Sequence, residues 1–181
     1  MTSTERTARD GRLGSERQSP RYPDAGRLFH LVLFTERRTG HLRPFPVARA
    51  LVGALRSVEA EGLSETHAYL VMPDQLQWLL RLGSFAELAR TVRLLKQRSE
   101  RAITARLMLP GPLWAPAWAE VPIDEETDLV ARTRSIFGLV DGSGNPDAAR
   151  HWPHWDCPNG ERWLPEGRFD ALLQPRSGEA G

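Results

Sequence analysis

The sequence THAYLVMPDQLQWLLRL, residues 66–82, contains two apolar runs separated by a short polar turn. The runs at 66–72 and 75–82 have the length and the apolar content of strands. Pro73 and Asp74 between them are typical turn residues, because proline fixes φ and aspartate bonds to nearby backbone groups. This stretch therefore predicts an antiparallel β-hairpin.

Two glutamines lie one residue apart in the second strand of this hairpin. Alternation along a strand places Gln75 and Gln77 on one face and Leu76 and Trp78 on the other, so we expect Trp78 in the core. Two side chains at this spacing have the geometry of paired metal ligands. A neutral amide oxygen is nevertheless a weaker ligand for a transition metal than an imidazole nitrogen.

The segments on either side of the hairpin alternate between strand and helix patterns. The predicted elements are a strand at 28–35, a helix at 45–61, strands at 66–72 and 75–82, a helix from 84 ending before 110, a strand at 113–123 and a helix at 124–137. Ser84 and Glu87 form a capping-box pattern at the start of the second helix, and Asp124 is expected to cap the third. Two prolines mark the 113–123 segment as an edge strand.

The order β-α-β-β-α-β predicts an α+β fold, a ferredoxin-like split β-α-β with an antiparallel sheet, two main helices on one face and a short C-terminal helix. With 181 residues, the chain is long enough for one domain with tails. We expect a disordered tail at 1–26, the domain at 27–140 and a partly disordered extension at 141–181, in which HWPHWDC (151–157) docks back on the domain.

The sequence contains no apolar run of the roughly 18 residues that span a bilayer, and its N-terminus lacks the apolar segment of a secretory signal. These features predict a cytoplasmic protein without membrane contact. The single cysteine, Cys157, excludes an intramolecular disulfide. His30 and His67 are expected on neighbouring strands as ordinary polar residues, and Tyr69 is expected to pack in the sheet.

Charge is distributed unevenly along the chain. Residues 27–116 carry 13 basic and 7 acidic side chains, a net charge of +6, whereas residues 117–181 carry 6 and 12, a net charge of −6. Basic residues recur at helical spacing in the second helix, and others follow the first strand. The candidate nucleic-acid ligands are Arg90, Arg93, Lys96, Arg98 and Arg101, with Gln97 between them, and Arg37, Arg38 and Arg43 in the loop. The same pattern also fits a solvated arginine-rich face.

Four segments, in this order, resemble the REP-associated tyrosine transposases, which belong to the single-tyrosine HUH transposases of bacterial insertion sequences. They are FHLVLFT, HAYLVMP with the glutamine-bearing strand behind it, RTVRLLKQRSERA and GPLW. The resemblance covers roughly residues 28–140. It implies a protein of DNA transposition that binds single-stranded or hairpin DNA beside its tyrosine-bearing helix. Family members use a divalent metal such as magnesium or manganese.

The resemblance also implies that the catalytic site is degenerate. In the family, two histidines around an apolar residue hold the metal, and a tyrosine in a pattern like L-K-x-x-Y attacks the DNA. Here Asp74 replaces the asparagine before the histidines, Gln75 and Gln77 replace the histidines, and Ser99 replaces the tyrosine. Ile103 stands where some relatives place a further amide ligand. We therefore expect no intact catalytic residue and no metal or other cofactor, with Ser99 facing the two glutamines.

Three hypotheses remain open from the sequence. The first is an inactive transposase-like protein that still binds hairpin or single-stranded DNA. The second is a divergent but active single-strand DNA nuclease or transposase, and the third is a ferredoxin-like scaffold that contacts other proteins.

Overall fold

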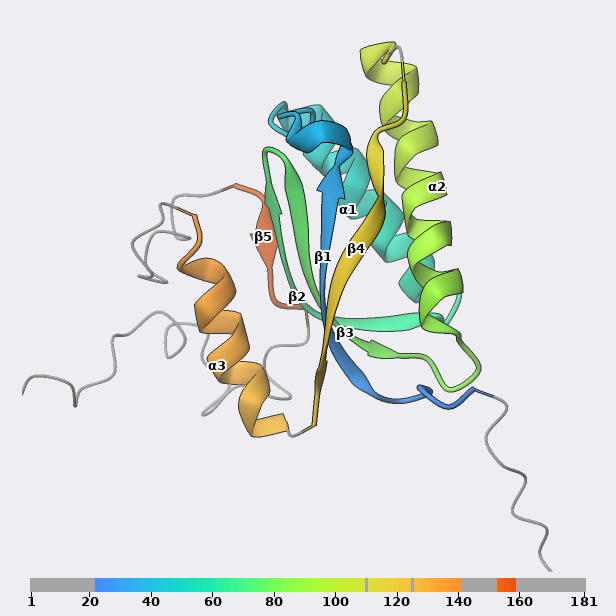
Figure 1. Cartoon of the computed structure of the whole chain (residues 1–181), viewed down its shortest axis with the longest axis vertical. Coiled ribbons are helices and arrows are strands. Elements are labelled where there is room, and N and C mark those ends of the chain that lie inside the picture. The colour runs from blue at the N-terminus through green and yellow to red at the C-terminus, as the bar shows by residue number, and fades with distance from the viewer. Residues whose placement is uncertain (1–21, 110, 125, 141–152, 159–181) are drawn as a thin grey trace, which may run out of the picture.

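The computed structural model describes residues 22–109, 111–124, 126–140 and 153–158. Figure 1 shows the helices and strands coloured in chain order. They are β1 (Leu28–Thr35), η1 (Glu36–Arg38), α1 (Phe45–Ala60), β2 (Ser64–Met72), β3 (Gln75–Leu82), α2 (Leu88–Leu107), β4 (Trp114–Ile123), α3 (Glu126–Phe137) and β5 (Trp155–Asp156). Residues 1–21 of the predicted tail and most of the predicted C-terminal extension lie outside the described residues, so the domain boundaries stay predictions. The expectation of disorder is wrong for residues 22–26, which form a turn whose Gly26 N–H donates to the Leu82 carbonyl at 2.9 Å.

The strands form a five-stranded antiparallel sheet in the order β4-β1-β3-β2-β5. The predicted hairpin is confirmed: β2 and β3 pair with Met72 opposite Gln75. The order of the first four strands is that of a split β-α-β fold, and the predicted α+β class is therefore confirmed. One expectation is wrong, because β3 lies between β1 and β2, and His30 and His67 are not on neighbouring strands.

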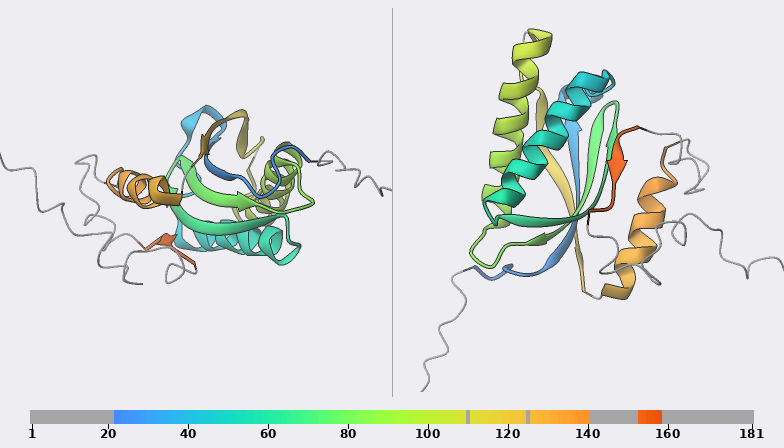
Figure 2. Two further views of the ribbon diagram at one scale, coloured as in Figure 1. Left: turned by 90° about the horizontal axis from the view of Figure 1, so that it is seen from below. Right: turned by 180° about the vertical axis from the view of Figure 1, so that it is seen from behind.

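The sheet has helices on both faces (Figure 2). The larger hydrophobic core lies between the sheet and the pair α1 and α2, and it contains Leu31, Trp78 and Val92. A smaller core lies on the other face, where Leu70 and Leu79 pack against α3. Alternation along each strand thus supplies apolar side chains to both layers.

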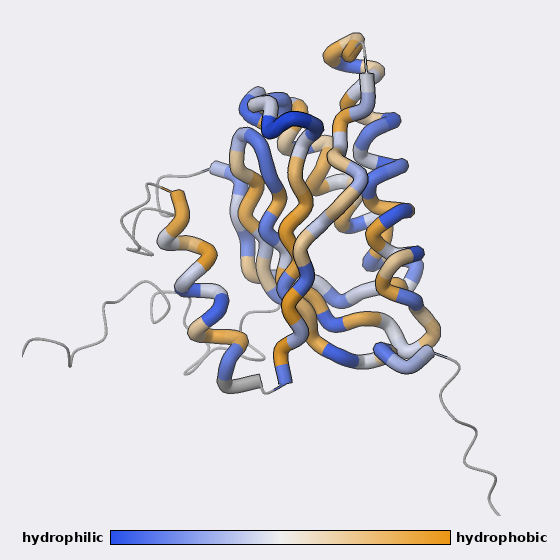
Figure 3. Tube along the Cα trace, in the orientation of Figure 1, coloured by the Kyte–Doolittle hydropathy of each residue, from blue (hydrophilic) through white to orange (hydrophobic). Residues whose placement is uncertain are grey.

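The helix α2 is amphipathic over its 20 residues. Its buried row packs on the sheet, and hydrophilic residues recur on its outer side, which Figure 3 shows as blue segments along the helix. None of the helices in the described ranges has the length and hydropathy that a membrane crossing requires.

The predicted capping box is wrong. α2 begins at Leu88, and its N-cap, Glu87, makes no side-chain capping bond. The residues before it form a turn in which the Ala86 N–H donates to the Gly83 carbonyl, so Ser84 lies too far from the first helical turn. Burial of Ala86 in the core favours this turn over an earlier helix start.

The predicted docking of the aromatic C-terminal segment is confirmed for residues 153–158. β5 pairs with β2 through Trp155 opposite Leu70. The Trp155 ring lies 5.3 Å from the Phe137 ring at the end of α3, which joins the smaller core to the sheet edge. Tyr69 packs in the sheet as predicted, and burial raises the pKa of its phenol.

A close backbone contact makes Gly83 the position most sensitive to an added methyl group. A Cβ there would lie 2.0 Å from the Gly62 carbonyl oxygen, so Gly83→Ala must displace the backbone at the end of the β2–β3 pair. We expect a loss of about 1–3 kcal/mol in the free energy of unfolding, measured in urea. Gly53→Ala is the matched control, because nothing lies within 4 Å and alanine favours the helix by about 1 kcal/mol. Equal stabilities for the two variants would contradict the described contact.

Candidate functional site

Gln75 and Gln77 lie on one face of β3, as the alternation predicts. They share that face with Leu79 of the smaller core, whereas Leu76 and Trp78 belong to the larger core. Both glutamine side chains are buried, with 8% and 4% of their surface exposed. The pair therefore lies on the α3 side of the sheet, and Trp78 is in the core as expected.

A histidine on the adjacent strand bonds to one of these glutamines. The His30 Nε2 and the Gln77 Oε1 lie 2.7 Å apart. Burial lowers the pKa of His30, the bond to Gln77 raises it in part, and the nearby Arg132 charge lowers it further. The Gln75 amide donates to the Met72 sulfur at 3.0 Å. His30 was classed as an ordinary polar residue from the sequence, which carries no signal for a bond between strands that are 47 residues apart.

This arrangement does not fit a catalytic divalent metal. It offers two neutral amides and one imidazole, and one amide is already bonded to that imidazole. Among the described residues, no group of three or more His, Cys, Asp or Glu side chains is placed to hold a metal ion.

The expectation that Ser99 faces the two glutamines is wrong. Ser99 is fully buried in α2 on the opposite face of the sheet, within the larger core. Its hydroxyl donates to the Leu95 carbonyl at 2.7 Å and accepts the Trp114 indole N–H at 3.0 Å. Ser99 follows the apolar row of α2, and that row packs on the Trp78 side of the sheet.

The arginines of the loop after β1 differ in the contacts that they make with the rest of the protein. Arg38 forms an ion pair with Asp74 at 2.7 Å, and its guanidinium lies over the Phe34 ring at 4.5 Å from the centroid. Arg37 and Arg43 are exposed to solvent. Arg38 therefore holds the loop to the β2–β3 turn, whereas Arg37 makes only a 4.0 Å contact with Glu36 and Arg43 makes no ion pair within the described ranges.

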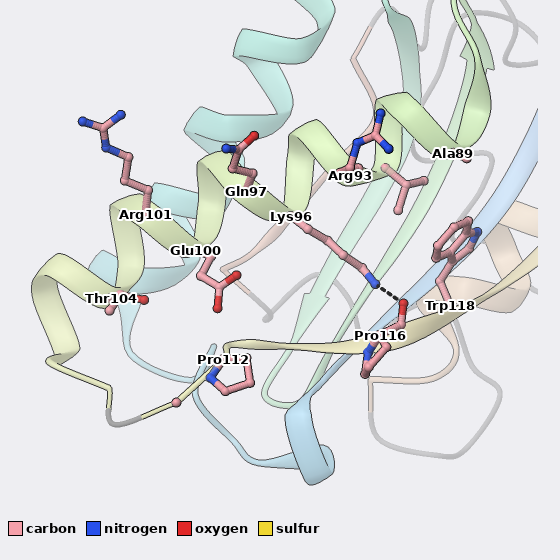
Figure 4. A pocket seen from close by; sticks show the side chains of 12 residues that line it. Ala89, Arg93, Lys96, Gln97, Glu100, Arg101, Thr104, Pro112, Pro116 and Trp118 are labelled. Carbon is pink, nitrogen blue, oxygen red and sulfur yellow. Dashed lines mark hydrogen bonds between the residues drawn. The ribbon is translucent and has the colours of Figure 1, made fainter.

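A groove of about 1130 Å³ runs between α2 and the segment that leads into β4 (Figure 4). Its walls combine cationic, apolar and amide side chains. The lining includes Arg93, Lys96, Gln97, Glu100, Arg101, Pro112 and Trp118. Three of the predicted nucleic-acid ligands are thus brought together, and Trp118, which is partly buried against the larger core, lies at the groove wall.

Lys96 shapes this groove by holding its two walls together. Its ammonium donates to the carbonyls of Ala115 and Pro116 at 2.7 and 3.0 Å, as Figure 4 shows for Pro116. The same ammonium lies 5.2 Å from the centroid of the Trp118 ring. Burial lowers the pKa of Lys96. Glu100 is also on α2 and makes a second bond across the groove, because its carboxylate accepts the Leu113 N–H at 2.7 Å.

The remaining basic residues of α2 differ in whether their side chains form an ion pair within the described part of the protein. Arg98 forms an ion pair with Glu61 at 2.6 Å and donates to the Ser57 hydroxyl at 3.2 Å. Arg90, Arg93 and Arg101 are exposed, and none of them pairs with an acidic side chain of the described ranges. These three arginines, together with the exposed Arg106 in the last turn, are open charges on α2 within the described ranges.

Ser99→Ala should lower the free energy of unfolding by about 1–3 kcal/mol, because it leaves the buried Trp114 N–H without its acceptor. Urea unfolding of Ser99→Ala, Trp114→Phe and the double variant measures this bond. The second substitution should cost less in the Ser99→Ala background, since the N–H is then already unpaired. Additive losses would show that the two side chains do not interact.

The stability of the protein should fall as the pH is lowered through the ordinary histidine range. The pKa of His30 lies below its ordinary value of 6.5 in the folded state, so below about pH 6.5 the unfolded chain binds more protons and is favoured. The contribution of neutral His30 to the free energy of unfolding is fully present above about pH 6.5. Urea unfolding from pH 7 to about pH 5 should show a weaker pH dependence for His30→Gln than for the unchanged protein. Identical profiles would contradict the burial of a neutral His30.

No protein-family model matches the sequence, and a search of curated proteins finds no match either. Solved structures do match. A REP-associated tyrosine transposase bound to a REP hairpin is similar at a TM-score of 0.59 and 19% identity, over 100% of this chain and 99% of that one.

A candidate transposase from Deinococcus radiodurans R1 is similar at 26% identity over 58% of this chain and 85% of that one, with a TM-score of 0.47 that is too low to support an argument. The full-length match in the first comparison includes the sheet and all three helices. The chain therefore has the HUH transposase fold of the REP-associated tyrosine transposase.

Proposed function

We propose that this protein binds single-stranded or hairpin DNA through α2 and the groove between α2 and β4, and that it neither cuts nor joins the DNA. The observation that carries the proposal is the groove itself, which Arg93, Arg101 and Trp118 line and in which the two arginines make no ion pair within the described ranges. The fold supports it, because the similar transposase was solved with a REP hairpin.

The chemistry of the groove suits a nucleic acid. Guanidinium groups hold phosphates through paired hydrogen bonds, and a rigid helix loses little entropy when it presents them. Aromatic rings add stacking surface for unpaired bases, worth about 1–3 kcal/mol per base. Lys96 fixes the Trp118 ring at the groove wall, so that surface is preformed.

Absence of strand transfer is the second part of the proposal. Gln75 and Gln77 are poor replacements for two imidazoles, and one of them is occupied by His30. Ser99 is buried, bonded to Trp114 and on the wrong face of the sheet to attack DNA near the glutamines. The helix on the glutamine face, α3, has the sequence ETDLVARTRSIF and so contains no tyrosine. No cofactor is needed for binding alone.

Replacing Arg90, Arg93 and Arg101 together by glutamine should weaken binding to a hairpin oligonucleotide and flatten its salt dependence. If three or four phosphates are neutralised, the log-log slope of the unchanged protein should be about −2 to −4, and the triple variant should lose about half of it or more. Fluorescence anisotropy at several salt concentrations measures both quantities. The control changes Arg27, Arg132 and Arg134 to glutamine, which removes the same charge away from α2. An unchanged slope in the first variant would favour the protein-contact scaffold instead.

Incubation with a hairpin or single-stranded oligonucleotide and magnesium or manganese should give neither a nick nor a covalent adduct. The physical reason is that no described group combines a nucleophile with two imidazole ligands. Denaturing gels and mass spectrometry of the protein detect both products. Metal-dependent cleavage that survives purification and disappears in Gln75→Ala/Gln77→Ala would establish the divergent nuclease instead.

A further inference from the structure

A second groove runs along the other flank of α2, between α2 and α1. Its volume is about 570 Å³. Three arginines line it together with small residues from both helices. The lining is Arg49, Ala50, Gly53, Ala54, Ser57, Glu61, Arg98, Ala102 and Arg106.

Two of these arginines are open to a ligand. Arg98 is paired with Glu61, but Arg49 is exposed and makes no ion pair within the described ranges. Arg106 is also exposed and bonds only to the Ala102 carbonyl of its own helix among the described contacts, so its charge is not neutralised. Gly53 has no side chain, so the bottom of the groove is open there and a phosphate backbone can come close to both guanidinium groups.

The helix α2 is therefore a ridge between two cationic grooves. Arg93 and Arg101 line the groove toward β4, and Arg49 and Arg106 line the groove toward α1. Arg90 and Gln97 are exposed on α2 two turns apart, on the outer side of the helix. Arginine pairs with the guanine edge and glutamine with the adenine edge in the major groove of DNA.

The dimensions of this ridge favour one type of nucleic acid. An α-helix with its side chains is about 10–12 Å across, and the major groove of B-form DNA is about 12 Å wide. The major groove of an A-form RNA helix is too deep and narrow for side chains to read. A single strand could fill only one of the two grooves beside α2.

We propose that α2 lies in the major groove of a double-stranded DNA stem, with the phosphates of one strand on Arg93 and Arg101 and those of the other on Arg49 and Arg106. This inference rests on the proposed DNA binding and specifies the form of the DNA. It also gives Arg49 and Arg106 a role that neither the sequence pattern nor the α2–β4 groove assigns.

The first test compares three probes with the full chain: a DNA hairpin, an RNA hairpin of the same sequence and an unstructured DNA strand of the same length. Arg49→Gln/Arg106→Gln should reduce the magnitude of the log-log salt slope by about 1.8 on the DNA hairpin, because each lost phosphate contact contributes about 0.9. The slope on the single strand should not change. Arg132→Gln/Arg134→Gln, on α3, is the matched control, and thermal melting confirms that each variant is folded.

A second test identifies the groove of the DNA independently of its sequence. Position 5 of cytosine faces the major groove, so a stem with glucosylated 5-hydroxymethylcytosines has that groove blocked. Binding to such a stem should weaken at least tenfold, whereas distamycin, which fills the minor groove, should not displace the protein.

The outcomes separate this inference from the proposed function. Binding of the RNA hairpin as tight as that of the DNA hairpin, displacement by distamycin or an unchanged slope for Arg49→Gln/Arg106→Gln would each overturn the stem geometry. If the single strand and the DNA hairpin still bind and Arg93→Gln/Arg101→Gln weakens both, DNA binding itself stands. Failure of the unchanged protein to bind any probe would remove both proposals.

Discussion

The alternation of side chains along β3 is the constraint on which the rest of the structure depends. Trp78 is fully buried in the larger core, and its indole N–H donates to the Thr66 hydroxyl at 3.2 Å. With Trp78 fixed, Gln75 and Gln77 must point to the opposite face, toward α3. A slip of one residue would exchange every side chain between the two faces and bring two amides into the apolar core, at a high cost in free energy.

This constraint separates the two surfaces that matter for function. The Gln75 and Gln77 pair lies on the α3 face, while the two grooves beside α2 lie on the other side of the sheet. A substitution at Gln75 or Gln77 therefore does not touch the residues that line those grooves. DNA binding can persist on one face while the chemistry is lost from the other, which is the central physical claim of the proposed function.

Much of the fold could be predicted from the sequence because its signals are periodic and local. Strands 28–35 and 75–82 were predicted with the observed bounds, and the strand order follows from the split β-α-β pattern. The failed capping box shows the limit of such signals, since a turn stabilised by burial of Ala86 overrides a local pattern. The His30–Gln77 bond depends on the register between two distant strands, which no spacing encodes.

The position of Ser99 could have been predicted from the residues. Ser99 continues the row of Val92 and Leu95, and that row packs on the same core as Trp78, opposite the glutamines. The α2–β4 groove was beyond prediction, because its walls are set by the contacts of Lys96 with carbonyls 19 and 20 residues along the chain.

The most direct measurement is a titration of the isotope-labelled full chain with a DNA hairpin, followed by amide and side-chain N–H shifts in NMR spectra. The account predicts large shifts for the exposed residues of α2, for Ala115 and for the Trp118 indole N–H. The Gln75 and Gln77 side-chain amides and the amides of α3 should not move, because they lie on the other face of the sheet. Large shifts at those two glutamines and in α3, with α2 unchanged, would contradict the account.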